Sequence, residues 1–247
     1  MKDYEAHTYG DRIAGVYDEL YGTLFDVDAT VALLAELAGD GPALELAIGT
    51  GRIALPLNER GVDVTGIDAS EAMVAELRAK PGGDDIDVVM GDFADVDVED
   101  CFNLVFVVFN TLFALTTQDD QVRCFTNVVE HLTDDGVFVV EAFVPDPTRF
   151  TRHQTTSIDD LDSDSVRLEA SRHDPVHQRV DSQHIHLRRG EPVEMYPVSI
   201  RYTYPSELDL MARLAGLRLR ARWGAWNKEP FTSESKFHVS VYERALT

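Results

Sequence analysis

The chain has 247 residues, 44% of them hydrophobic and 9% aromatic, with 22 Lys and Arg residues against 44 Asp and Glu residues. This composition indicates one ordinary globular chain. Cys101 and Cys124 lack the spacing of a metal or redox pair, which argues against a disulfide framework and a thiolate zinc site. The first 20 residues lack an apolar signal segment, and no stretch approaches the roughly 20 apolar residues of a spanning helix. We therefore expect a cytoplasmic protein without a membrane partner.

The acidic excess is confined to the first part of the chain. Residues 1–150 hold 8 basic and 30 acidic residues, whereas residues 151–247 hold 14 of each. Nucleic-acid affinity rests largely on Lys and Arg side chains that neutralise phosphates, so this surface would repel a polyanion. We expect no nucleic-acid partner.

Residues 43–143 alternate short apolar runs with helical patterns. The runs LVFVVF and VFVVEAF are continuous, which is typical of strands covered on both faces. Strands are predicted at 43–48, 62–67, 86–90, 104–109 and 137–143, and helices at 52–60, 70–80 and 118–132. Ser70 followed by Glu71 predicts an N-cap. Together these patterns predict a parallel sheet with helices on both sides.

Beyond Pro145 the pattern changes. Residues 151–164 are polar and are predicted to form a loop or lid, while 166–173, 177–187 and 193–204 alternate as antiparallel strands do. A helix is predicted from Pro205 to about Ala215, with Gly216 as its C-cap, followed by strands at 217–226 and 236–243. We therefore predict an α/β fold with a doubly wound, mostly parallel seven-stranded sheet and an antiparallel β cover inserted after the fifth strand. One domain would span residues 1–247, with a cofactor-binding core at 1–150, the cover at 151–204 and the last helix and strands at 205–247.

A tight glycine turn follows the first predicted strand, and two cofactor interpretations compete for it. Gly49-x-Gly51-x-x-Ala54 matches a dinucleotide fingerprint, and Asp68 lies 17 residues past Gly51, where it could bind a ribose. However, Glu45 precedes Gly49 by four residues. A carboxylate there would crowd a pyrophosphate but would suit a ligand with an ammonium group and no phosphates.

Three motifs at strand intervals, ELAIGTGR, GIDAS and GDFADV, resemble the class I S-adenosylmethionine-dependent methyltransferases, especially bacterial small-molecule members. The resemblance covers about residues 9–150 by motif and implies a Rossmann-like fold and S-adenosylmethionine as cofactor. It implies that Glu45, Ala47, Gly49 and Gly51 line the methionine and ribose parts, that Asp68 takes the ribose hydroxyls, and that Asp92 and Phe93 hold the adenine. Further cofactor-binding candidates beside these motifs are Tyr17, Ala69, Met73, Phe109 and Asn110. Ala47 stands where the family usually has Gly, and its methyl group could narrow the pocket.

Two further segments, one after Phe109 and one from Tyr17, bear on the same resemblance. After Phe109 the chain reads NTLF, without the Asp/Asn-Pro-Pro-aromatic motif or nucleophilic Cys of the nucleic-acid methyltransferases. Asn110 could serve the methyl donor or cap a turn. The segment YDELYG, from Tyr17, resembles an N-terminal segment that folds over the cofactor in relatives, so that Tyr17 or Tyr21 would close the pocket. The alternative is plain packing of an amphipathic helix.

Histidines 173, 177, 184 and 186 fall in the predicted cover, but Arg179, Gln183 and Arg188 crowd the same region, so we predict no metal site. An amine or hydroxyl acceptor must lose a proton, and the candidate bases are Tyr17, Glu141, His153 and His186. The cover, with Arg201, Tyr202 and Tyr204, would select the acceptor.

The resemblance implies N- or O-methylation of a small molecule: a metabolite, a sugar or a natural-product intermediate. The alternatives are a nicotinamide-dependent oxidoreductase and a non-catalytic cofactor-binding protein. Because an exposed edge strand of the cover could pair with a second copy, a monomer or a homodimer is expected.

Overall fold

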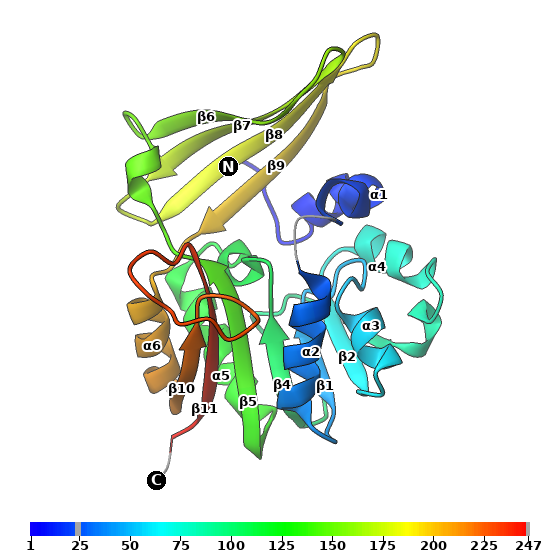
Figure 1. Cartoon of the computed structure of the whole chain (residues 1–247), viewed down its shortest axis with the longest axis vertical. Helices are drawn as coiled ribbons and strands as arrows, with labels where there is room; N and C mark the ends of the chain where they lie inside the picture. Colours follow the sequence, from blue (N-terminus) through cyan, green and yellow to red (C-terminus); the bar gives the residue numbers. More distant parts are fainter. Residues whose placement is uncertain (23–25, 246–247) are drawn as a thin grey trace.

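The computed structural model describes residues 1–22 and 26–245, and its strands form two sheets (Figure 1). Sheet A has seven strands in the order β10-β11-β5-β4-β1-β2-β3, and sheet B has four in the order β6-β7-β8-β9. Sheet A consists of β1 (Ala43–Leu46), β2 (Val64–Asp68), β3 (Asp87–Met90), β4 (Phe102–Val107), β5 (Leu132–Phe143), β10 (Leu217–Trp223) and β11 (Phe237–Arg244). Sheet B consists of β6 (Gln154–Leu161), β7 (Ser165–Asp174), β8 (Arg179–Arg188) and β9 (Glu194–Arg201). The helices are α1 (Thr8–Tyr21), α2 (Val27–Ala38), α3 (Ala54–Glu59), α4 (Glu71–Arg78), α5 (Gln118–Glu130) and α6 (Pro205–Leu214), with 3₁₀ turns η1 (Gly83–Asp85), η2 (Thr111–Ala114) and η3 (Pro147–Arg149).

The predicted fold class is confirmed. Strands β1 to β5 pair in parallel, and only β11 runs against its neighbours in sheet A among the described strands. Sheet B is wholly antiparallel and occupies the chain between β5 and α6, where the β cover was predicted. Within residues 1–22 and 26–245, no helix is both long and apolar enough to cross a bilayer.

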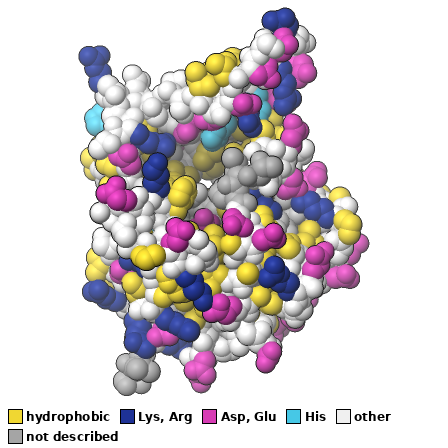
Figure 2. Space-filling model, in the orientation of Figure 1, with side chains coloured by type: hydrophobic (Ala, Val, Ile, Leu, Met, Phe, Trp, Pro, Cys, Tyr) yellow, Lys and Arg dark blue, Asp and Glu magenta, His cyan; other side chains and the backbone are white. Residues whose placement is uncertain are grey.

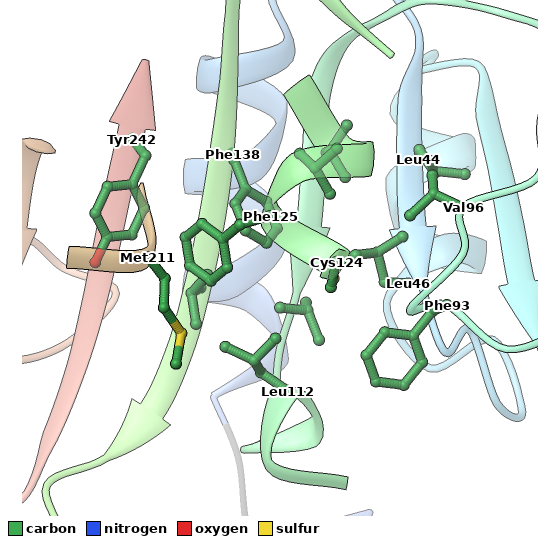
Figure 3. Packing of buried hydrophobic residues seen from close by; sticks show 14 of the residues in the cluster. Leu44, Leu46, Phe93, Val96, Leu112, Cys124, Phe125, Phe138, Met211 and Tyr242 are labelled. Carbon is green, nitrogen blue, oxygen red and sulfur yellow. The ribbon is translucent and has the colours of Figure 1, made fainter. Parts of the chain in front are cut away.

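Both faces of sheet A are buried, as its continuous apolar runs predict. Along β4, Val105 and Val107 pack on one face with α5 and α6, whereas Leu104 and Phe106 pack on the other with α2 and α3. On the first face, the ring of Phe125 from α5 lies edge-on to Phe138, with ring centroids 5.1 Å apart (Figure 3). This packing holds the central strands rigidly and so fixes the positions of the loops at their ends.

The helix ends follow their local sequence. The Ser70 side chain accepts a hydrogen bond from the Met73 N–H and starts α4, as its N-cap pattern predicts. Asp26 and Thr117 cap α2 and α5 in the same way. Gly216 has a φ of +84°, the left-handed conformation that follows a helix C-terminus and suits glycine.

The prediction of a loop at residues 151–164 was wrong. Residues 154–161 form β6, the outer strand of sheet B, which pairs with β7 from Gln154 opposite Arg172 to Leu161 opposite Val166. Most side chains of β6 are exposed, so the strand has no apolar periodicity. Backbone pairing with β7 forms it instead, and such pairing leaves no mark in a hydropathy pattern.

Several element boundaries also differ from the predictions. Strand β5 begins at Leu132, which pairs with Phe102, rather than at Val137. Strand β1 ends at Leu46, because the next residue already has a positive φ. The N-terminal lead-in holds α1 and α2, of which the sequence analysis anticipated only a helix around Tyr17. Such differences of a few residues arise where turn geometry, not burial, ends an element.

Sheet B is joined to sheet A by a buried polar network around Arg201 at the end of β9. The Arg201 guanidinium lies 2.6 Å from Glu207 Oε1 on α6 and 2.5 Å from Gln121 Oε1 on α5. The side chain of Gln121 in turn donates to the Arg201 carbonyl oxygen at 2.8 Å. Arg201, predicted to help select an acceptor, therefore anchors the base of sheet B.

Candidate active site

A cavity of about 1040 Å³ lies where the carboxyl ends of the parallel strands meet the inner face of sheet B. Figure 2 shows the molecule hollowed below sheet B on this face. The sheet A wall comes from loops that follow β1 to β4 and from α4, and contains Ala47, Gly49, Asp68, Ala69, Met73, Asp92, Phe93, Phe109 and Asn110. The sheet B wall comes from sheet B, two adjoining loops and the last residue of β5, and contains Phe143, Arg149, Phe150, Glu169, Val180, Ser182, His184, Val198, Ile200, Tyr202, Glu234 and Lys236.

The glycine turn after β1 divides its residues between two tasks. Ala47, Gly49 and Gly51 all have positive φ, at 58°, 58° and 75°. A Cβ added to Gly49 would meet only the Ala47 carbonyl oxygen, at 4.0 Å, so the space over this glycine is open to the cavity. A Cβ added to Gly51 would lie 2.2 Å from Leu77 Cδ1. Gly51, predicted to bind the cofactor, instead permits close packing of α4 and does not line the cavity.

Asp68 joins the turns that follow β1 and β2. Its Oδ2 accepts a hydrogen bond from the Gly49 N–H at 2.7 Å, and its Oδ1 accepts one from the Ser70 N–H at 2.8 Å. Burial raises the pKa of this carboxyl, and the backbone N–H groups oppose that shift because they stabilise the charged form. Asp68 therefore presents a carboxylate of fixed orientation to the cavity.

Glu45 lies beneath this turn and does not line the cavity. It is 4% exposed, and burial raises its pKa well above the ordinary range despite a hydrogen bond from the Ala54 N–H. Its Oε2 has no hydrogen-bond partner among the described residues. Burial therefore favours the protonated form of Glu45, which was expected to line the cofactor but lies behind the cavity lining.

The loop after β3 supplies a second acidic residue and an aromatic side chain. Asp92 Oδ1 accepts a hydrogen bond from the Ala94 N–H at 2.9 Å, which makes a local turn. Both Asp92 and the largely buried Phe93 line the cavity. One oxygen of Asp92 thus forms the turn, and the residue also borders the cavity.

Helix α1 covers the cavity from the side of α4. The Arg52 guanidinium lies 4.8 Å from the Tyr17 ring centroid and 4.7 Å from that of Phe109, which fixes all three side chains. Tyr17, Tyr21 and Tyr9 line the cavity, and the hydroxyls of Tyr9 and Tyr21 are 3.3 Å apart. Helix α1 therefore packs against its neighbours and also borders the cavity, so packing and closure of the pocket are compatible roles for its tyrosines.

Burial raises the pKa of Tyr17 to about 12. At neutral pH its hydroxyl is therefore a hydrogen-bond donor, and the base role predicted for it is disfavoured.

The other three predicted bases do not line the cavity. Glu141 is 6% exposed, and its Oε2 accepts a hydrogen bond from the Phe109 N–H at 2.8 Å, so it shapes the loop that carries Asn110. His153 is exposed just before β6. His186 is buried against the Tyr196 ring, with centroids 5.2 Å apart. Their places at a strand end, in the loop after it and in the cover suggested Glu141, His153 and His186, but none of the three side chains reaches the cavity.

Asn110 has its side-chain oxygen engaged by the protein. It has a φ of +64°, and its Oδ1 accepts a hydrogen bond from the Phe143 N–H at 2.6 Å. The side chain therefore does not cap η2 but is bonded to the end of β5, and the residue lines the cavity.

Histidines 173, 177, 184 and 186 do not gather into a ligand set, and the described residues contain no group of three or more His, Cys, Asp or Glu side chains suited to a metal ion. His173 Nε2 pairs with the Tyr202 hydroxyl at 2.9 Å, and His177 Nδ1 lies 2.7 Å from Asp174.

Sequence reasoning missed several residues of the sheet B wall, among them Glu169, Ser182 and Lys236. Glu169 and Ser182 occupy inward positions of alternating strands, where an apolar residue is usual. The available signal was that polar residues interrupt the apolar alternation of these strands. This signal indicates a site only once β7 and β8 are known to face the cavity.

Comparison with known proteins places these features in a family. A methyltransferase domain family matches residues 43–136. The CcbJ methyltransferase from Streptomyces caelestis is 41% identical, with a TM-score of 0.91 over 98% of this chain and 100% of that chain. The cypemycin N-terminal methyltransferase of Streptomyces sp is 27% identical over 245 residues, which cover 93% of this chain and 98% of the relative. The S-adenosylmethionine-bound CalS10, an amino pentose methyltransferase from Micromonospora echinaspora, shares the fold at 19% identity, with a TM-score of 0.68 over 92% and 96% of the two chains.

These matches decide between the two cofactor interpretations of the glycine turn in favour of the methyl donor. High identity over nearly the full length, together with the cavity at the strand ends, shows an enzyme that uses S-adenosylmethionine, from a group that modifies small molecules. The chain belongs to the class I S-adenosylmethionine-dependent methyltransferases.

Proposed function

We propose that this enzyme transfers the methyl group of S-adenosylmethionine to an amine nitrogen of a small molecule. The observation that carries the proposal is the charge of the cavity away from the sheet A turns. Five acidic residues line that part, against two strongly basic ones: the acids are Glu5, Asp120, Asp146, Glu169 and Glu234, and the bases are Arg149 and Lys236. Aliphatic amines are cations at neutral pH, so this lining attracts them and disfavours phosphorylated or carboxylated acceptors.

The names of two relatives support a nitrogen acceptor. One is a methyltransferase of the N-terminus of cypemycin, and another acts on an amino pentose. These names concern those proteins, and they agree with the acidic lining described above.

The residues of the sheet A wall fit the methyl donor. We propose that Asp68 binds the ribose hydroxyls, that Asp92 and Phe93 hold the adenine, and that Ala69 and Met73 complete that side. The open space over Gly49 admits the ligand close to the backbone. Tyr17, Phe109 and Asn110 would then border the reactive end.

S-adenosylmethionine supplies an electrophilic methyl group, and the chain supplies alignment and exclusion of water. The acceptor must approach as a neutral amine, because a protonated nitrogen has no lone pair with which to attack. The acidic wall concentrates the ammonium form near the cavity, and the ammonium group releases its proton to bulk water before the transfer. Tyr17, which stays protonated, does not take that proton; its hydroxyl oxygen can accept a hydrogen bond from an amine N–H, which leaves the nitrogen lone pair free to attack.

The test is a methyl-transfer assay with S-adenosylmethionine and matched amines and alcohols, such as cyclohexylamine with cyclohexanol and glucosamine with glucose. Mass spectrometry would detect the product, and NMR would locate the added methyl. We expect methylation only of the amines, on nitrogen. A methyl ether from any pair would contradict the proposal.

A further inference from the structure

The middle of β7 places a carboxylate on the inner face of sheet B, within the cavity. Glu169 lines the cavity, and its side chain is only 18% exposed. An inward position on an antiparallel sheet usually holds an apolar side chain, because a buried charge costs free energy unless it is well paired. Glu169 thus occupies a position that packing alone would give to another residue.

One oxygen of this carboxylate is held from three sides. Ser171 Oγ donates to Glu169 Oε1 at 2.6 Å, Ser182 Oγ donates to the same atom at 2.9 Å, and Arg149 Nη2 lies 3.4 Å from it. The two serine hydroxyls lie 2.7 Å apart and belong to side chains that are 4% and 5% exposed. Two buried hydroxyl donors on one oxygen hold the carboxylate in place.

The same bonds keep Glu169 ionised. Burial would raise its pKa, but the serine hydroxyls and the Arg149 and His184 side chains outweigh that effect, so the pKa of Glu169 lies below its ordinary value. At neutral pH the cavity therefore contains a negative charge of fixed orientation.

The other oxygen remains available. Across the described part of the chain, no side chain or backbone group donates a hydrogen bond to Glu169 Oε2. An ionised carboxylate has about four acceptor positions, and a purely structural carboxylate would use both of its oxygens. His184 lies directly opposite Glu169 in the register of β7 and β8 and also lines the cavity.

We propose that Glu169 Oε2 binds a hydroxyl group of the methyl acceptor, so that the enzyme selects hydroxylated amines, such as amino sugars, over plain alkyl amines. Glu169 belongs to sheet B, whereas the proposed donor contacts come from sheet A, so this carboxylate serves the acceptor. A hydroxyl suits it better than a second ammonium group, because Arg149 already balances part of the charge and a hydroxyl costs less to desolvate. This inference rests on the proposed N-methylation for the identity of the reacting group only.

The experiment measures binding to the protein loaded with S-adenosylhomocysteine, which cannot react. Calorimetry would compare glucosamine with cyclohexylamine, which share a six-membered ring and a primary amine but differ in hydroxyl groups. A hydrogen bond to a charged group predicts at least roughly tenfold tighter binding of glucosamine. Glu169→Gln should reduce that preference to about threefold or less, and Ser182→Ala, which frees the carboxylate to rotate, should reduce it partially.

The matched control is Glu191→Gln, which removes an exposed carboxylate of the β8–β9 turn, outside the cavity lining. It should keep the full preference, and all variants should bind S-adenosylhomocysteine as the unmodified protein does. Equal affinity of the unmodified protein for the two amines, or an unchanged preference in Glu169→Gln, would overturn the proposal. Methylation on oxygen combined with loss of the preference in Glu169→Gln would instead refute the N-methylation and leave the subsite standing.

Discussion

The two walls of the cavity are built in different ways. The sheet A wall consists of short loops whose backbone is fixed locally, by positive φ at Ala47 and Gly49 and by the Asp68 bridge between two turns. The sheet B wall consists of side chains on a separate antiparallel sheet, which the Arg201 network joins to the core. One wall therefore depends on the geometry of strand ends, and the other on how two sheets are held together.

This difference separates the two binding tasks of a methyltransferase, which are to bind the methyl donor and to select the acceptor. A common methyl donor can be bound by a conserved backbone geometry at the sheet edge, where all strand ends meet. An acceptor can be changed by substituting inward side chains such as Glu169 and Ser182 without disturbing that edge. Four predictions test how the two sheets and their walls are held.

The largest effect is expected from Arg201→Ala, which breaks the link between the walls. Removal of Arg201, which is 5% exposed, takes away the cationic partner of Glu207 and leaves that carboxylate with the neutral amide donors of Gln118 and Gln178. Loss of one member of a buried ion pair typically costs about 3–5 kcal/mol. Urea denaturation should show that loss as a lower free energy of unfolding. The control is Arg189→Ala, because Arg189 forms an exposed ion pair with Asp164 at the turns of sheet B. It should change the free energy of unfolding by less than about 1 kcal/mol. Similar values for the two variants would mean that the network does not join the sheets.

Asp68→Ala tests the sheet A wall. It removes the carboxylate that we assign to the ribose and leaves the Gly49 and Ser70 N–H groups without their acceptor. We expect S-adenosylhomocysteine to bind about 1.5–3 kcal/mol more weakly by calorimetry, or roughly 10- to 150-fold. Asp87→Ala, an exposed carboxylate at the start of β3, is the control and should bind normally. Normal binding by Asp68→Ala would remove the ribose assignment.

The pH dependence of stability should reflect a buried histidine of sheet A. Burial, together with repulsion from Arg222, lowers the pKa of His238 to about 3. The unfolded chain binds a proton there near pH 6.5, whereas the native protein does not, so stability falls as the pH drops below about 6.5. Between pH 6.5 and 5.5, His238 should contribute a loss of about 1.4 kcal/mol at most.

Denaturation at both pH values would isolate this contribution. His238→Asn should have a flatter pH dependence than the unmodified protein, whereas His177→Asn, at an exposed turn of sheet B, should not. If the two variants show the same dependence, His238 is not the group responsible.

The smallest effect concerns Ala47, where the chain has Ala at a positive φ of 58°. Left-handed backbone is strained for a residue with a Cβ, so Ala47→Gly should raise the free energy of unfolding by about 1 kcal/mol. Ala79→Gly, at a right-handed position with a φ of −73°, should lower it by a similar amount. Thermal unfolding would compare them, and the same sign for both would show that Ala47 is not strained.

The residues that the sequence analysis placed at the cofactor lie mostly where it expected. Asp68, Asp92 and Phe93 line the cavity because they lie at or just beyond the carboxyl ends of β2 and β3, and parallel pairing brings such positions together. Gly51 and Glu45 come from the same motif but lie behind the cavity lining. A motif locates a turn, but which of its residues faces the ligand depends on the packing of α4 and α3 against it.

The predicted bases show the limit of such reasoning most clearly. Glu141 follows the apolar run of β5, but its side chain turns to the Phe109 N–H. His153 and His186 lie in the cover, yet neither borders the cavity. Position along a strand does not determine the direction in which a side chain points after the strand bends or ends.

The α/β class, the parallel core, the cover after the fifth strand and the glycine turn could be predicted from the amino-acid sequence, because each depends on local periodicity or on a short motif. Three features required the folded chain: residues 154–161 form β6, Arg201 anchors sheet B, and Glu169 faces the cavity with one oxygen held by Ser171 and Ser182. These features arise from pairing and side-chain contacts between residues distant in the chain. Such contacts have no local periodicity, so they become visible only when the two sheets are placed together.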